Sequence, residues 1–243
     1  MESLTIIGAG EAGTRAALHL RESGWDGEIV LIGQEPHIPY ERPPLSKAVL
    51  AEGVTPPRLS SAEQLQELQI KFLQGSQVAE IDRQSHRIRL QNDEWFPYDK
   101  LLLATGASAR RLTCIGSEHA LVLRNLDEAL ALRSLLAPGK HLILIGAGFI
   151  GLELAASARK VGCEVTVLEM APRILGRAVP AEVAEVVASE HKQQGVEIRC
   201  DVQLDRIQAL KSGYTVKLKN SESINGDLVV AGIGAVPEVA LAE

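Results

Sequence analysis

Short unbroken runs of apolar residues, each leading into glycines and then an amphipathic segment, organise this chain. The clearest case is the stretch 141–169. Its residues 142–145 form an apolar run, as expected of a strand buried on both faces of a parallel sheet. A segment with helical apolar spacing follows up to the breaker Gly162, and a second apolar run covers 165–168. The pattern predicts one complete β-α-β unit.

Glycines stand where this unit turns from strand to helix. Gly146, Gly148 and Gly151 have G-x-G-x-x-G spacing, which permits a tight turn, close approach of a pyrophosphate, and close helix–strand packing. The helix start directs free N–H groups and a partial positive charge at a phosphate. Glu169 ends the second strand, where an acidic side chain accepts hydrogen bonds from an adenosine ribose. The sequence therefore predicts a dinucleotide site.

The same pattern occurs at the start of the chain. Residues 4–7 predict a strand, Gly8, Gly10 and Gly13 repeat the glycine spacing, and residues 29–32 predict the second strand. Two fingerprints imply two nucleotide sites. In this copy Gln34 stands where a carboxylate is expected and Glu35 follows, so either side chain is a candidate for the ribose.

Residues 36–57 hold six of the eleven prolines, which predicts ordered irregular chain rather than helix or strand. Composition alone favours a rigid linker for residues 39–47, in which Ser46 is a candidate helix N-cap. The functional alternative is that the backbone and Arg42 surround a flat ring system and that Lys47 brings a positive charge to it.

The rest of the chain predicts further regular elements. Strands 78–81 and 88–90 predict an antiparallel meander, and residues 100–104 predict a buried strand that leads into Ala104-Thr105-Gly106. Capping-box patterns at Ser61 and Asn125 predict two helices. A helix over 180–194 and strands over 196–199, 204–209, 214–218 and 227–231 complete the prediction, ending at Gly232-Ile233-Gly234.

Composition narrows the class of protein. The chain of 243 residues is 46% hydrophobic and 23% charged, as in ordinary globular proteins. A net charge of -6 argues against nucleic acid or an anionic membrane as a partner. Neither a signal peptide nor a membrane span is predicted. The three cysteines are far apart, which argues against a metal site and fits a reducing, cytoplasmic location.

Together, the motifs GAGEAG, YERPPLSK, LLLATGA, GAGFIGLELAA, VTVLE and AGIGAVP resemble the FAD-dependent ferredoxin and rubredoxin reductases that oxidise NADH, especially the reductase components of aromatic-ring dioxygenases of the phenylpropionate type. The resemblance covers essentially the whole chain. It implies an α/β fold with two Rossmann-like three-layer domains of the glutathione-reductase type, the NAD domain being inserted in the FAD domain. The boundaries expected are 1–112 for the FAD domain, 113–236 for the NAD domain, and 237–243 for the start of a return to the FAD domain. The family's C-terminal interface domain and second FAD motif are expected to be absent, and FAD binding to be weak in consequence.

The resemblance also assigns roles to residues. Lys47 is expected at the flavin N5 edge, paired with Glu153, which also meets the nicotinamide. The residues expected to bind FAD are Gly8, Gly10, Ala12, Gly13, Gln34, Glu35, Arg42, Pro43, Lys47, Val78, Ala104, Thr105, Gly106 and Arg124. The residues expected to bind NAD are Gly146, Gly148, Phe149, Ile150, Gly151, Glu153, Glu169, Gly232, Ile233 and Gly234.

The activity implied is hydride transfer from NADH to flavin N5, followed by release of single electrons to a [2Fe-2S] ferredoxin that serves an oxygenase. Two alternatives stay open at this point. One is an NADH oxidase or peroxidase, against which the absence of a cysteine near Lys47 argues. The other is a dinucleotide-binding module without turnover.

Overall fold

The computed structural model describes residues 2–243, which form two compact units. Unit 1 comprises the residues up to Glu41, Pro56–Ser108 and Pro237–Glu243, and unit 2 comprises Arg42–Thr55 and Ala109–Val236. Where the chain passes from one unit to the other, β8 (Ala107–Ala109) pairs with β16 (Ala235–Pro237). Among the described residues, no helix has both the length and the apolar character that crossing a bilayer requires.

Unit 1 is built on a parallel sheet of four strands in the order β3-β2-β1-β7. Strand β1 (Ser3–Ile7) continues through Gly8 into α1 (Glu11–Glu22), and the chain returns as β2 (Glu28–Gly33). The outer strands are β3 (Ile70–Gln74) and β7 (Lys100–Leu103). The first predicted β-α-β unit is therefore confirmed.

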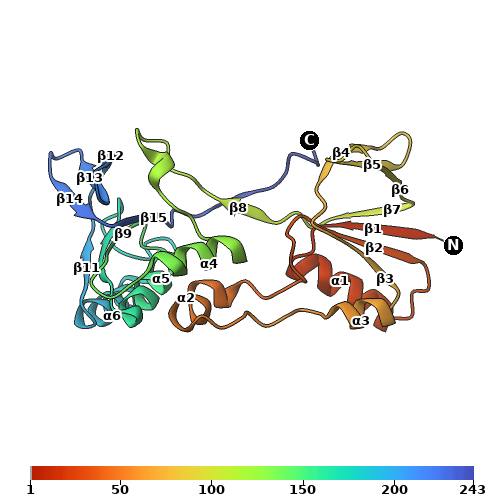
Figure 1. The fold of residues 1–243 in the computed structure, drawn as a ribbon, viewed down its shortest axis with the longest axis horizontal. Helices are drawn as coiled ribbons and strands as arrows, with labels where there is room; N and C mark the ends of the chain where they lie inside the picture. Colours follow the sequence, from red (N-terminus) through yellow and green to blue (C-terminus); the bar gives the residue numbers. More distant parts are fainter. Residues whose placement is uncertain (1) are drawn as a thin grey trace. The chain divides into compact units, whose positions relative to one another are not determined.

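Each face of this sheet has its own cover. Helices α1 and α3 (Ala62–Glu67) lie on one face, and the meander of β4 (Val78–Asp82), β5 (Arg87–Leu90) and β6 (Trp95–Pro97) lies on the other (Figure 1). Because side chains alternate along a strand, Ile6 packs among the helices while Ile7 packs under the meander. Three layers result.

Unit 2 repeats this plan. Its parallel sheet has the order β11-β10-β9-β15, formed by β11 (Val196–Arg199), β10 (Glu164–Leu168), β9 (His141–Ile145) and β15 (Leu228–Ala231). Helix α5 (Phe149–Val161) connects β9 to β10, and Gly162 ends it in the left-handed conformation, φ +96°. The two parallel sheets have the same topology. If the parallel strands of each unit are numbered in chain order, both sheets have the strand order 3-2-1-4.

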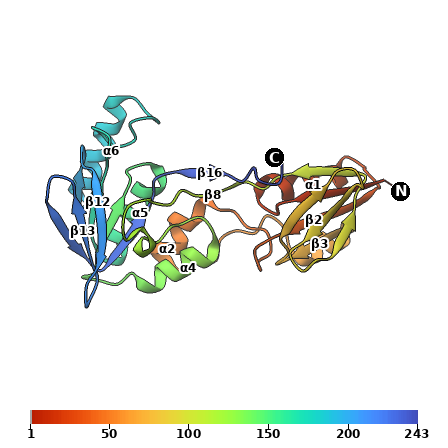
Figure 2. The same ribbon diagram turned by 90° about the horizontal axis from the view of Figure 1, so that it is seen from above.

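A helical layer and an antiparallel sheet enclose the parallel sheet of unit 2. Helix α5 contacts β9, β10 and β11, and α6 (Ala181–Gln193) contacts β11. The other face carries β12 (Leu204–Ala209), β13 (Tyr214–Leu218) and β14 (Ser223–Gly226), the last of which the sequence did not predict (Figure 2). Ile143 and Val229 pack against Val216 in the core between the two sheets. The predicted α/β fold with two Rossmann-like three-layer units is confirmed.

The proline-rich segment is helical, so the prediction of irregular chain over 36–57 is wrong for its middle part. Pro43–Ser46 forms a 3-10 helix (η1), and Ala48–Glu52 forms the short helix α2. Pro43 and Pro44 stand in the first turn of η1, where no intrahelical N–H is required, so they start the helix rather than break it. The N-cap of α2 is Lys47 and not Ser46.

Helix α2 belongs to unit 2 by its packing. It lies against α5 and against α4 (Leu126–Leu135), which the predicted capping box of Asn125 and Glu128 opens (Figure 1). Val49 and Leu50 have no exposed surface. The Arg133 guanidinium donates to the carbonyl of Leu50 and packs over Gly53, which ends α2 at φ +74°. The expected boundary at residue 112 had placed this segment with the first domain.

Strand β7 corrects a second expectation. The sequence predicted a buried strand over 100–104, but β7 is the edge strand of its sheet, and Leu102 and Leu103 are 36% and 39% exposed. An apolar run predicts that a segment is a strand but not which neighbours cover it.

Candidate functional site

Open space lies before the helix that follows each glycine fingerprint. In unit 1, Gly8 has φ +113°, and a Cβ at this position would lie 2.1 Å from the carbonyl oxygen of Ala104. A Cβ at Gly13 would lie 1.9 Å from the oxygen of Gly8, so α1 packs directly on the turn. Gly10 differs, because a Cβ there meets no heavy atom within 4 Å. The glycine that a pyrophosphate would approach thus faces free space.

The fingerprint of unit 2 has the same construction. A Cβ at Gly146 would lie 2.5 Å from the oxygen of Gly232, and one at Gly151 would lie 2.2 Å from the oxygen of Gly146. A Cβ at Gly148, the N-cap of α5, meets no heavy atom within 4 Å. In both units the residue after the last parallel strand lies against the first glycine; it is Ala104 in unit 1 and Gly232 in unit 2. Both cradles therefore fit the pyrophosphate of a dinucleotide.

The acidic residue of unit 2 is fixed beside its fingerprint. Glu169 accepts hydrogen bonds from the backbone N–H of Ala147 through Oε2 (2.7 Å) and from that of Ala171 through Oε1 (2.8 Å). A carboxylate accepts about four hydrogen bonds, so two positions remain for ribose hydroxyls. The orientation of Glu169 suits the role that its position predicted.

Arg173 lies nearby, and its Nη2 is held by backbone. That nitrogen donates to the carbonyls of Gly176 and Val179, at 3.0 Å each, and so fastens the loop after β10. Within this loop Leu175 is buried, has φ +51°, and donates its N–H to the carbonyl of Ala147. The loop therefore packs on the glycine turn.

The two candidates for the first ribose site have different surroundings. Gln34 is exposed, whereas Glu35 is half-buried and accepts a hydrogen bond from the Tyr40 hydroxyl at 2.5 Å. Ala12 is exposed on the first turn of α1, and the Val78 side chain is buried in the core beneath the meander, so its backbone is what could contact a nucleotide.

The segment Thr105-Gly106 is tied to the last residues of the chain. Thr105 donates its hydroxyl to the carbonyl of Glu238 (2.6 Å), and Glu238 donates its N–H to the carbonyl of Gly106 (3.0 Å).

In unit 2, Phe149 and Ile150 are 57% and 45% exposed in the first turn of α5. These two apolar side chains at a helix start are available to a ligand.

Lys47 and Glu153 form the predicted ion pair, with 2.9 Å between Nζ and Oε1. They are 106 positions apart in the sequence but both belong to unit 2. Arg42 and Arg124 also come together in this unit, since Nη1 of Arg42 donates to the carbonyl of Arg124 at 2.7 Å. Of the residues expected to bind FAD, Arg42, Pro43, Lys47 and Arg124 lie in unit 2 and the others in unit 1.

Sequence reasoning missed two residues beside this pair. Ser46 donates its hydroxyl to Oε2 of Glu153 (2.6 Å), and Ser157 donates its hydroxyl to the carbonyl of Ser46 (2.7 Å). The spacing of Glu153 and Ser157 was a usable signal, because residues four apart share a helix face.

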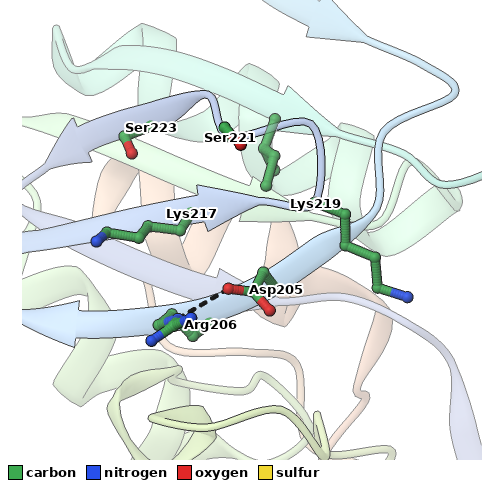
Figure 3. A pocket seen from close by; sticks show the side chains of 7 residues that line it. Asp205, Arg206, Lys217, Lys219, Ser221 and Ser223 are labelled. Atoms are coloured by element: carbon green, nitrogen blue, oxygen red, sulfur yellow. Dashed lines mark hydrogen bonds and ion pairs between the residues drawn. The ribbon is translucent and has the colours of Figure 1, made fainter.

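Other features of the described chain offer no comparable site. A hollow of about 470 Å³ on the antiparallel sheet of unit 2 is lined by Asp205, Arg206, Lys217, Leu218, Lys219, Ser221 and Ser223 (Figure 3). It contains no fingerprint residue, and its lysines point away from one another (Figure 3). Residues 2–243 hold no cluster of three or more His, Cys, Asp or Glu side chains fit for a metal ion.

Comparison with known proteins places the chain in a family. The family described as "Pyridine nucleotide-disulphide oxidoreductase" matches residues 2–243. The rubredoxin-NAD(+) reductase of Pseudomonas putida is 39% identical, over 99% of this chain and 64% of its own length. The 3-phenylpropionate/cinnamic acid dioxygenase ferredoxin-NAD(+) reductase component of Photorhabdus laumondii is also 39% identical, over 96% of this chain and 60% of its own.

Solved structures agree. The ferredoxin reductase for the CYP199A2 system from Rhodopseudomonas palustris superimposes with a TM-score of 0.95 at 37% identity, over 100% of this chain and 61% of that one. The chain thus spans roughly three-fifths of the length of the relatives it matches. FAD and NAD(H), the cofactors expected from the sequence, agree with the two cradles and with these relatives. With its whole length matched and both fingerprints built as dinucleotide cradles, the chain belongs to the pyridine nucleotide-disulphide oxidoreductase family.

Proposed function

We propose that this chain is the dinucleotide-binding part of an FAD-dependent reductase that oxidises NADH and passes the electrons to a small iron–sulfur protein. The observation that carries the proposal is the pair of equally built cradles in one chain, each with an open glycine before a helix. One dinucleotide site would suffice for a binding module, whereas two allow one nucleotide to reduce the other.

The first cradle is assigned to FAD and the second to NADH. When bound, FAD accepts a hydride and releases its electrons singly, which is chemistry that the cofactor supplies. The protein's share is to bind and orient. The first turns of α1 and α5 offer backbone N–H groups to phosphates, and Glu169 offers carboxylate oxygens to a ribose. Gln34 or Glu35 serves the other ribose.

Lys47 supplies the charge at the reacting edge in this proposal. Its ammonium lies 2.9 Å from Glu153, half exposed, on a segment held against α5. A fixed positive charge stabilises negative charge that develops during reduction. The ion pair lowers the cost of holding a lysine in such a place.

The names of the relatives support a small redox protein as the electron acceptor. Those named above are called rubredoxin and ferredoxin reductases, and another solved relative, at 35% identity and a TM-score of 0.94, is a putidaredoxin reductase joined covalently to putidaredoxin. Within that class we propose a [2Fe-2S] ferredoxin that serves an oxygenase, such as an aromatic-ring dioxygenase, in a cytoplasmic setting. The three free cysteines fit a reducing compartment.

Anaerobic reduction tests the proposal. The protein loaded with FAD should absorb at about 450 nm and should lose this absorbance when NADH is added without oxygen. Subsequent addition of an oxidised [2Fe-2S] ferredoxin should restore it, with reduction of the iron–sulfur protein. A flavin that NADH does not bleach would contradict the proposal. Reoxidation by oxygen but not by ferredoxin would favour an NADH oxidase.

A further inference from the structure

Two side chains of α5 hold Ser46 from both sides. Ser46 is 5% exposed, and its hydroxyl donates to Oε2 of Glu153 at 2.6 Å. Its carbonyl accepts from the hydroxyl of Ser157 at 2.7 Å. Glu153 and Ser157 are four positions apart on one helix, so they present a carboxylate and a hydroxyl along the same face. The junction between η1 and α2 is therefore attached to α5 through Ser46.

The carboxylate of Glu153 is shared between two partners. Oε2 accepts from Ser46, and Oε1 lies 2.9 Å from Nζ of Lys47. Hydrogen bonds to an ionised group are about twice as strong as neutral ones. Rotation of the carboxylate would break at least one of these contacts, so the Ser46 hydroxyl fixes the oxygen that Lys47 uses.

The ammonium of Lys47 has little else to fix it. Its side chain is 51% exposed, and its other polar contact, with the carbonyl of Pro43, is longer at 3.3 Å. A lysine side chain loses rotamer entropy when it is held in one place. The position of its charge therefore depends on Glu153, whose orientation depends on Ser46.

We propose that Ser46 and Ser157 are positioning residues for Lys47 and that they act through Glu153. The proposal rests on the function proposed above, in which Lys47 is the charge beside the reacting edge. Ser157 fixes the backbone of Ser46, Ser46 fixes the carboxylate of Glu153, and Glu153 fixes the ammonium. If the two serines only filled space, removing their hydroxyls would change stability and leave Lys47 as it is.

The first experiment needs no cofactor. Trace acetylation with acetic anhydride, followed by mass spectrometry, gives the relative reaction rate of each lysine. An amine engaged in an ion pair reacts more slowly than a free one. In Ser46→Ala the rate at Lys47 should rise by at least about threefold, the range expected for loss of a part-exposed ion pair. Glu153→Gln sets the upper limit, and Ser157→Ala should show a smaller rise.

Controls separate positioning from general loosening. Ser134→Ala removes a hydroxyl that bonds only within α4, to the carbonyl of Ala131, and should leave Lys47 unchanged. Lys140, paired with Asp227 at 2.7 Å, is an internal reference that should keep its rate in every variant. Equal rates at Lys47 in Ser46→Ala and in the unmutated protein would overturn the proposal. A rise at all lysines alike would also overturn it, because it would mean loosening of the whole unit.

The second experiment uses the FAD-loaded protein in single turnover. Ser46→Ala should slow reduction by NADH by about tenfold while the Kd for NADH changes much less, because the serine contacts Glu153 but none of the fingerprint glycines and not Glu169. Ser46→Thr keeps a hydroxyl and should recover part of the rate. Failure of the unmutated protein to react with NADH would refute the proposed function, whatever the labelling shows. Unimpaired reduction in Ser46→Ala would refute the positioning role alone.

Discussion

At the scale of single residues, the surroundings of Glu169 predict which nicotinamide cofactor the second cradle prefers. Both oxygens of Glu169 are held by backbone N–H groups, so the charge cannot turn away from the ribose position. A 2′-phosphate would set a second negative charge against it. NADP sites commonly offer an arginine to this phosphate, but Nη2 of Arg173 is bonded to two carbonyls of its own loop.

We therefore expect NADH to be preferred over NADPH by at least about a hundredfold in kcat/KM, equivalent to ~2.7 kcal/mol. Glu169→Ala should reduce this preference mainly by weakening NADH, as measured by flavin reduction with each cofactor. Glu164→Ala, at the other, exposed end of the same strand, is the matched control and should keep the preference. Equal rates with both cofactors in the unmutated protein would show that Glu169 does not have this role.

One added methyl group should weaken mainly NADH binding at Gly148 and mainly folding stability at Gly151. Gly148→Ala introduces a Cβ with no heavy atom within 4 Å, so unfolding should become easier by no more than about 1 kcal/mol while NADH binds at least tenfold more weakly. Gly151→Ala places a Cβ 2.2 Å from the oxygen of Gly146 and should destabilise unit 2 by several kcal/mol. Denaturation and NADH titration measure the two effects. Similar stability losses in both variants would contradict the assignment of the open space.

At the scale of elements, an ion pair joins two strands of the second sheet. Asp227, just before β15, accepts a hydrogen bond from Nζ of Lys140 through Oδ1 (2.7 Å). It accepts a second one from the backbone N–H of His141 in β9 through Oδ2 (2.8 Å). The pKa of the Asp227 carboxyl is lowered, mainly by the hydrogen bond from the Lys140 side chain and to a smaller extent by that from the backbone N–H of His141. A carboxyl whose pKa is lowered by folding stabilises the folded protein at pH values above its unfolded-state pKa. This contribution is lost as the pH falls through the folded-state pKa.

Asp227→Asn should therefore lower the free energy of unfolding at pH 7 by an amount that disappears on acidification. The pair is part-exposed, so the loss should be about 1 kcal/mol or less. Urea denaturation at pH 7 and again far enough below the unfolded value of about 3.9 to protonate the carboxyl in the folded state as well compares the two conditions. A loss of the same size at both pH values would show that the carboxylate charge contributes nothing.

The elements also show how far the sequence could predict the structure. Both β-α-β units were predictable, because buried parallel strands, glycine turns and helices leave distinct local patterns. Helix α2 was not, since prolines at a helix start and prolines in a loop are alike in composition. The exposure of Leu102 and Leu103 depends on which strands neighbour β7, which no local pattern contains. The Lys47–Glu153 pair came from family resemblance, and its serine contacts needed the packing of η1 on α5.

At the scale of the whole molecule, one segment packs in a different unit from the residues that flank it in the sequence. Arg42–Thr55 lies in the sequence between two parts of unit 1 yet forms part of the helical layer of unit 2. The attachment includes an ion pair, hydrogen bonds from Arg133 and Ser157, and the fully buried side chains of Val49 and Leu50. The stability of unit 2 should thus depend on residues encoded far from the rest of it.

Leu50→Ala should destabilise unit 2 by about 2–5 kcal/mol, the usual cost of truncating a buried leucine. Hydrogen exchange followed by mass spectrometry should show faster exchange in α4 and α5 and little change in β1, β2 and β3. Leu65→Ala, a truncation in the helix-side core of unit 1, is the matched control and should show the reverse. Faster exchange in β1–β3 than in α5 for Leu50→Ala would refute the assignment of the segment to unit 2.

The packing of Arg42–Thr55 also determines how chimeras of this chain with its relatives should be cut. Unit 2 taken from a relative as one continuous piece, 109–236, would lack the helix that packs against its α4 and α5. The host's own 42–55 would then meet foreign helices, and Lys47 would be matched to a carboxylate that it did not evolve with. Two pieces exchanged together, 42–55 with 109–236, keep that interface intact, and we expect such grafts to fold where the single-piece graft does not.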